Sequence, residues 1–104
     1  MPMPGDGELH VDDDGRIRLA GRLDLSTVAG LADRGTELFV QRQEAIVDLA
    51  DVSRTDSAAL ALLLEWQRAA GRSGCRLRFE NVPETLRSIA DVCGIEAVIE
   101  LPAS

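Results

Sequence analysis

The sequence predicts an α/β domain with a single mixed β-sheet of four to five strands and helices packed on it. Segments in which polar and apolar residues alternate, as in strands, are interspersed with segments whose apolar residues recur at helical spacing. The last expected strand is Ala97–Leu101. Apolar residues make up 45% of the chain and aromatic residues only 3%, so Leu, Val, Ile and Ala must form the core. The length of 104 residues fits one domain.

The N-terminal part predicts a tail and two short strands. Residues 1–7 are rich in Pro and Gly, and we expect this segment to be disordered. The two strands are expected at Glu8–Val11 and Arg16–Ala20, and Gly15 suits the turn between them because glycine accepts a positive φ. Residues 8–104 are expected to form the single folded domain.

The middle of the chain predicts a helix and then the clearest strand. Apolar residues recur at helical spacing from Ser26 or Thr27 to Val40, which predicts a helix there. The apolar residues of Glu44–Leu49 predict a strand buried on both faces. A polar turn is expected between this strand and a helix that opens at Asp56-Ser57.

The second half predicts two more helices around one strand. The first helix is expected over Ser57–Ala70 and stops at Gly71, a residue type that often ends helices. Cys75–Asn81 alternates like a half-buried strand. Pro83 suits the first turn of the last helix, where its missing N–H does no harm, and Gly94 ends that helix.

The charge composition excludes several classes of function. The formal net charge is −7, and all eleven basic residues are Arg. A Walker-type phosphate loop, a Schiff-base enzyme and a protein kinase each need a lysine amine, so these classes are excluded. An acidic chain with few aromatics is a poor nucleic-acid binder, and no apolar run is long enough to cross a bilayer. We therefore expect a cytoplasmic protein with no nucleic-acid partner and no direct membrane insertion.

No metal ion or other cofactor is expected. Cys75 and Cys93 do not form a metal-binding or redox motif, and buried free cysteines behave as small apolar residues. Asp48, Asp51 and Asp56 are close in sequence, but strand alternation sends carboxylates in different directions. A metal site would need them to converge on one point.

Asp56 and Ser57 stand where the polar turn is expected to meet the second helix. One interpretation is plain capping, because a side-chain oxygen can accept from a free backbone N–H at a helix start. The other is that Ser57 faces a partner there, and that a phosphate on it would add about −1.5 to −2 charges. The single histidine, His10, lies far from Ser57 in the sequence. No nucleophile–base pair is therefore available, and catalysis is not expected.

The second helix carries apolar residues on more than one side. Leu60 follows the spacing expected of core residues, whereas Leu62 and Trp66 fall toward another side. Tryptophan is enriched at the hot spots of protein interfaces. Trp66 is therefore either a core residue or an anchor for a partner.

Two motifs resemble the STAS domain family. Residues 47–60, Val-Asp-Leu-Ala-Asp-Val-Ser-Arg-Thr-Asp-Ser-Ala-Ala-Leu, resemble its central motif, and Gly21–Asp24 resembles its Gly-x-Leu-Asp turn. In the anti-sigma-factor-antagonist branch a partner kinase phosphorylates the serine that corresponds to Ser57, and that branch has Ser-Gly-Leu where this chain has Ala-Ala-Leu at residues 58–60. In the MlaB branch, of bacterial phospholipid transport, the hydroxyl residue contacts the transporter's ATPase subunit.

The resemblance implies a STAS fold and a non-catalytic binding function. The motif from Ser53 to Leu64 is more similar to the MlaB branch. We therefore expect a protein that binds and regulates the ATPase subunit of a phospholipid-transporting ABC transporter. The alternative is an anti-sigma-factor antagonist that is switched by phosphorylation of Ser57 by an anti-sigma kinase. The contact residues expected on the partner-binding surface are Asp24, Thr55, Asp56, Ser57, Leu60, Leu62 and Trp66.

Overall fold

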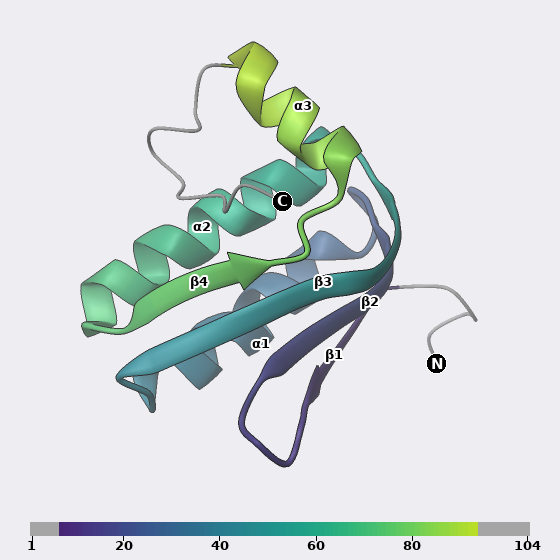
Figure 1. The fold of residues 1–104 in the computed structure, drawn as a ribbon. Helices are drawn as coiled ribbons and strands as arrows, with labels where there is room; N and C mark the ends of the chain where they lie inside the picture. The colour runs from purple at the N-terminus through teal and green to yellow at the C-terminus, as the bar shows by residue number, and fades with distance from the viewer. Residues whose placement is uncertain (1–6, 94–104) are drawn as a thin grey trace.

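The computed structural model describes residues 7–93 and shows a mixed sheet with three helices (Figure 1). The prediction of an α/β fold with one mixed sheet is confirmed. The elements in chain order are β1 (Glu8–Val11), β2 (Ile17–Leu23), α1 (Val28–Val40), β3 (Glu44–Thr55), α2 (Ser57–Ser73), β4 (Arg76–Glu80) and α3 (Glu84–Cys93).

The sheet has the order β1-β2-β3-β4. The short hairpin makes β1 and β2 antiparallel, whereas the crossovers through α1 and α2 make β2, β3 and β4 parallel. The expected fifth strand at Ala97–Leu101 and most of the expected N-terminal tail lie outside the described residues.

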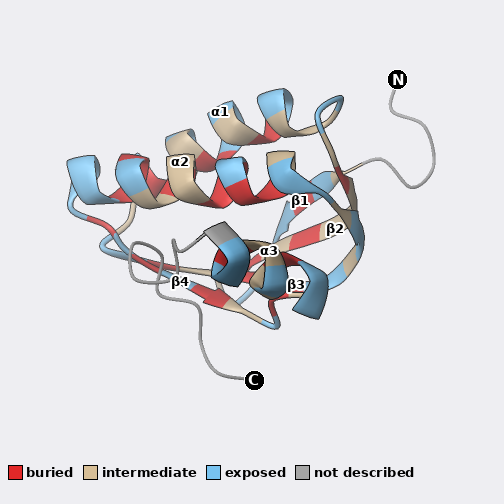
Figure 2. Ribbon diagram, turned by 90° about the horizontal axis from the view of Figure 1, so that it is seen from above, coloured by how far each residue is buried: buried red, intermediate tan, exposed pale blue. Residues whose placement is uncertain are grey.

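The two long helices cover one face of the sheet. Figure 2 shows α1 and α2 side by side above the strands, with their buried residues turned toward the sheet. Alternate strand residues such as Ile17, Val47 and Phe79 point into this core and are almost fully buried. Their neighbours on the other face include several charged side chains, such as Arg16 and Arg78. The helix α3 packs against α2 near the carboxyl ends of the parallel strands (Figure 1).

The strand β3 is longer than the sequence indicated. The prediction that the strand ends at Leu49 and a polar turn follows is wrong, because β3 continues to Thr55 and stays paired with β2 as far as the Leu23–Thr55 pair. Backbone hydrogen bonds of a parallel ladder do not depend on side-chain polarity, so mostly polar, largely exposed residues extend the strand. Two register shifts between β2 and β3 give β3 two extra residues against its partner.

The helix α2 also exceeds its expected end. It passes through Gly71 and ends at Ser73, and Gly74 has the left-handed conformation (φ 77°) that closes the helix. Gly71 lies in open space on the surface, and a glycine inside a helix costs only about 1 kcal/mol relative to alanine. Cys75, the residue after Gly74, is buried as expected.

Candidate functional site

An open groove of about 340 Å³ lies where β2 and β3 end and α2 begins. The parallel pairing sets Leu23 beside Thr55, so the chain segments that leave the two strands start next to each other. Ser57 follows as the first residue of α2. The residues that line the groove are Arg22, Leu23, Asp24, Arg54, Thr55 and Asp56.

Asp56 and Ser57 have different roles at the start of α2. Asp56 is the N-cap residue, and its Oδ1 accepts a hydrogen bond from the Ala58 backbone N at 2.8 Å. The capping interpretation is therefore confirmed for Asp56. Ser57 is exposed, and within residues 7–93 its hydroxyl makes no hydrogen bond. The Ser57 hydroxyl is thus available to another molecule at the positive end of the helix dipole.

Asp24 organises the turn between β2 and α1. Its Oδ1 accepts hydrogen bonds from the Ser26 hydroxyl at 2.6 Å and the Ser26 backbone N at 3.0 Å, and its Oδ2 lies 2.6 Å from Arg22 Nε. The hydrogen bond from the Ser26 hydroxyl is the main reason that the pKa of Asp24 is below its ordinary value, and Arg22 contributes less. Asp24 therefore carries a negative charge at the rim of the groove and fixes the local backbone.

Thr55 connects the groove to α3. Its Oγ1 lies 3.1 Å from the Thr85 Oγ1, so the two hydroxyls share a hydrogen bond. Sequence analysis did not single out Thr85, Arg22 or Arg54. Arg22 and Arg54 are paired across the two strands, and the register shifts that produce this pairing leave no pattern in the sequence.

Three of the expected contact residues are in the core. Leu60, Leu62 and Trp66 are 4%, 3% and 0% exposed, so the prediction that they lie on a contact surface is wrong. Trp66 packs edge-on against Phe39, with ring centroids 5.8 Å apart, and its Nε1 donates to a backbone carbonyl of α1. The side of α2 that carries Trp66 is covered by α1, and a helix covered both by a sheet and by another helix is apolar on two sides.

The carboxylates that were considered as metal ligands point to other partners. Asp48 is buried, accepts hydrogen bonds from Asn81 Nδ2 and the Ala50 backbone N, and lies 3.7 Å from Arg16 Nη1. Asp51 instead pairs with Arg18. Among residues 7–93 no three groups of the metal-binding types come together. No helix in the same range combines the length and the apolar character needed to cross a membrane.

Comparison with known proteins decides the family. The family model described as "Mlab, STAS domain" matches residues 8–101, nearly the whole chain. The chain belongs to the STAS domain family. The resemblance read from its two motifs is therefore confirmed, and the chain is a non-catalytic STAS-domain protein.

Relatives of this STAS domain include anti-sigma-factor antagonists. The anti-sigma-B factor antagonist of Bacillus subtilis (strain 168) is 26% identical over 92 residues, which cover 88% of this chain and 84% of the relative. An anti-sigma factor antagonist from Mycobacterium paratuberculosis has a similar structure, with a TM-score of 0.75, 18% identity and coverage of 100% and 92% of the two chains. The antagonist SpoIIAA in its unphosphorylated form gives a TM-score of 0.63 at 19% identity, with coverage of 82% and 81%. At these identities the two structures show the fold alone.

The departure from the antagonist motif at residues 58–60 lies partly below the surface. Ala59, where antagonists have glycine, is 0% exposed, so its methyl group belongs to the core of this STAS domain. Only Ala58, which is half-buried, stands near the surface beside Ser57. The extra methyl group at position 59 therefore leaves the Ser57 hydroxyl accessible.

Proposed function

We propose that this STAS domain binds and regulates the ATPase subunit of a phospholipid-transporting ABC transporter of the Mla type, in the cytoplasm. The contact would form through a docking surface that consists of Asp24, Arg54, Thr55, Asp56, Ser57 and Thr85. The exposed Ser57 hydroxyl, held at a capped helix start, is the observation that carries the proposal. The MlaB description of the matching family model supports the choice of partner.

The docking surface suits a partner that supplies polar groups in fixed positions. Ser57 offers one donor and two acceptor positions, and burial against a partner without matching groups would cost free energy. Rigid elements hold the surface, because Thr55 ends a strand, Ser57 begins a helix and Asp24 fixes the turn between β2 and α1. A preformed surface loses little conformational entropy on binding.

Regulation would follow from binding alone. A domain that binds only one conformation of the ATPase stabilises that conformation by mass action. No chemical step on the STAS domain is needed for this mechanism.

The test is co-purification of the full chain from native lysate, followed by identification of the captured protein. The wild type is expected to recover an ABC transporter ATPase. Ser57→Glu should abolish the recovery, because the added carboxylate lies beside Asp56 at the contact. Gln41→Glu is the matched control, since it adds the same charge at an exposed position after α1, at the other end of the molecule, and should leave recovery unchanged. Equal recovery with both variants would refute the docking surface.

The second candidate function is an anti-sigma-factor antagonist switched at Ser57. The antagonist of Bacillus subtilis at 26% identity favours it, and the burial of the Ala59 methyl group is compatible with it. A phosphate on Ser57 would add about −1.5 to −2 charges at the contact, and its charge and bulk would break a complex with an anti-sigma kinase. Recovery of such a kinase in the same experiment, with no ATPase, would favour this function over the transporter role.

A further inference from the structure

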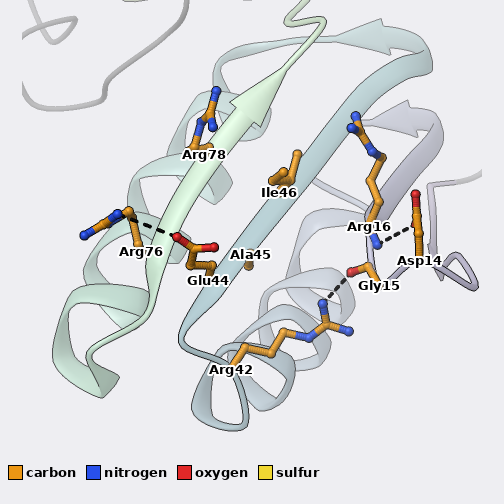
Figure 3. A pocket seen from close by; sticks show the side chains of 9 residues that line it. All are labelled: Asp14, Gly15, Arg16, Arg42, Glu44, Ala45, Ile46, Arg76 and Arg78. Carbon is orange, nitrogen blue, oxygen red and sulfur yellow. Dashed lines mark hydrogen bonds and ion pairs between the residues drawn. The ribbon is translucent and has the colours of Figure 1, made fainter.

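A second pocket, of about 260 Å³, lies at the other end of β3 from the docking surface. It opens on the sheet face that α1 and α2 do not cover, near the β1–β2 turn and the segment that joins α1 to β3 (Figure 3). The residues that line it are Asp14, Gly15, Arg16, Arg42, Glu44, Ala45, Ile46, Arg76 and Arg78. We refer to it as the arginine pocket.

The arginine pocket is basic in a chain that is acidic as a whole. Four arginines and two carboxylates line it, although the chain has a net charge of −7. The sheet register brings Arg78 beside Ile46. Arg16 lies one position before Ile17, which pairs with Val47. Arg16, just before β2, and Arg78 of β4 therefore flank the apolar Ile46 side chain, as Figure 3 shows.

The four arginines differ in how far carboxylates neutralise them. Arg16 forms an ion pair with Glu80 and lies close to Asp48, and Arg76 lies 3.6 Å from Glu44. Arg42 and Arg78 have no carboxylate partner within residues 7–93.

Most N–H donors of the Arg42 guanidinium are not used by residues 7–93. Its Nη1 donates to the Gly15 carbonyl oxygen, a neutral acceptor that fixes the position of the guanidinium (Figure 3). A guanidinium has five N–H donors, and the other four have no acceptor in the described part of the chain. Arg78 is exposed and makes no hydrogen bond to any residue of the described range. Two of the arginines that line the pocket thus have no carboxylate partner among residues 7–93.

We propose that the arginine pocket binds a small molecule that carries a phosphate or carboxylate group on an apolar body. Guanidiniums bind planar or multivalent oxyanions through paired N–H donors. The half-buried Ile46 gives the apolar body a surface to contact. Because the chain as a whole repels anions, the affinity must come from this local arrangement.

The experiment is a titration of ¹⁵N-labelled full-length protein, at constant ionic strength, with inorganic phosphate, phenyl phosphate and benzoate. We expect saturable shifts of backbone amides at Gly15, Ile46 and Arg78, with phenyl phosphate binding more tightly than inorganic phosphate. Arg42→Gln combined with Arg78→Gln should weaken phenyl phosphate binding about tenfold or more, because two charge-assisted contacts are lost. Tighter binding of benzoate than of phenyl phosphate would identify the carboxylate as the preferred group.

The matched control is Arg68→Gln combined with Arg72→Gln, which removes the same charge from exposed positions of α2. Equal loss of affinity in both double variants would mean general electrostatics only and would overturn the proposal. The absence of saturable shifts up to the solubility limit of the probes would also overturn it. If the Arg42 change disturbs folding, Arg78→Gln alone provides the test, because this exposed side chain has no hydrogen bond or ion pair to another residue of the range 7–93.

Discussion

Asp56 and Ser57 show how two adjacent side chains can serve stability and recognition separately. The Asp56 carboxylate accepts a hydrogen bond from the backbone of α2, whereas the Ser57 hydroxyl has no hydrogen-bond partner in the described part of the chain. The helix start can therefore keep its cap while Ser57 is contacted or modified.

This division of roles predicts different stabilities for two alanine variants. Asp56→Ala should lower the free energy of unfolding by about 1 kcal/mol, because the cap of α2 is lost. Ser57→Ala should change it by less than about 0.5 kcal/mol, as is usual at the surface. Urea denaturation of both variants measures the difference. A loss at Ser57 as large as that at Asp56 would show that the hydroxyl is part of the cap.

Asp48 predicts a dependence of stability on pH. Burial alone would raise its pKa, but the hydrogen bonds from Asn81 and the Ala50 backbone N, with the charge of Arg16, overcome that effect and hold the pKa below the ordinary value of 3.8. A pKa lowered by folding stabilises the protein above the unfolded pKa, and this contribution is lost as the pH falls through the folded pKa.

Asp48→Asn should therefore lower the free energy of unfolding by about 1 kcal/mol at pH 7. The difference from wild type should shrink as the pH falls below 3.8. Thermal unfolding between pH 7 and the acid transition provides the comparison. Asp33→Asn, at an exposed position of α1, is the control and should follow the wild type. A deficit for Asp48→Asn that stays constant through this range would contradict the role assigned to its charge.

At the scale of elements, the contact between α1 and α2 depends on one glycine. Gly35 of α1 lies against the Trp66 indole, and a Cβ at this position would overlap the ring. The Trp66 ring lies edge-on to Phe39, and its Nε1 donates a hydrogen bond to the Ala32 carbonyl oxygen. The close approach lets α1 cover an aromatic side chain that would otherwise be exposed.

Gly35→Ala should destabilise the protein by about 1–3 kcal/mol through overpacking. Gly30→Ala is the matched control in the same helix, because no atom lies within 4 Å of its added Cβ. That change should stabilise the protein by about 0.5–1 kcal/mol through helix propensity. Chemical denaturation, with Trp66 fluorescence as the probe, reports both effects. Equal stability of the two variants would show that α1 and α2 can move apart at little cost.

At the scale of the whole molecule, β3 separates two surfaces of different chemistry. The docking surface lies at its carboxyl end, and the arginine pocket lies at its start. Arg54, at the docking surface, lies nine positions after Ala45, in the arginine pocket, and about 3.3 Å per residue puts roughly 30 Å between them. Effects of changes at sites this far apart are normally additive.

The two surfaces should therefore act independently. Ser57→Glu should leave phenyl phosphate binding at the arginine pocket unchanged. The Arg42→Gln and Arg78→Gln double variant should still recover the partner. Titration and co-purification of both variants test this expectation. A change at one end that alters binding at the other by more than about threefold would instead reveal coupling between the two ends.

Within residues 7–93, the sequence by itself determined the order of strands and helices, and it also indicated the mixed sheet, the capped start of α2 and the family. These features depend on neighbouring residues, on the period of apolar positions or on short motifs, all of which are local. Elements such as Glu8–Val11 and the start of α2 at Ser57 were predicted at their observed positions for this reason.

Only the tertiary structure decided which apolar side of α2 is covered, how far β3 extends and which side chains meet. The burial of Trp66 depends on α1, and the pairing of Arg22 with Arg54 depends on two register shifts. Thr55 reaches Thr85 only because α3 packs near the end of β3. Periodicity shows that a face is apolar, but the neighbour that covers the face is chosen by the packing of distant segments.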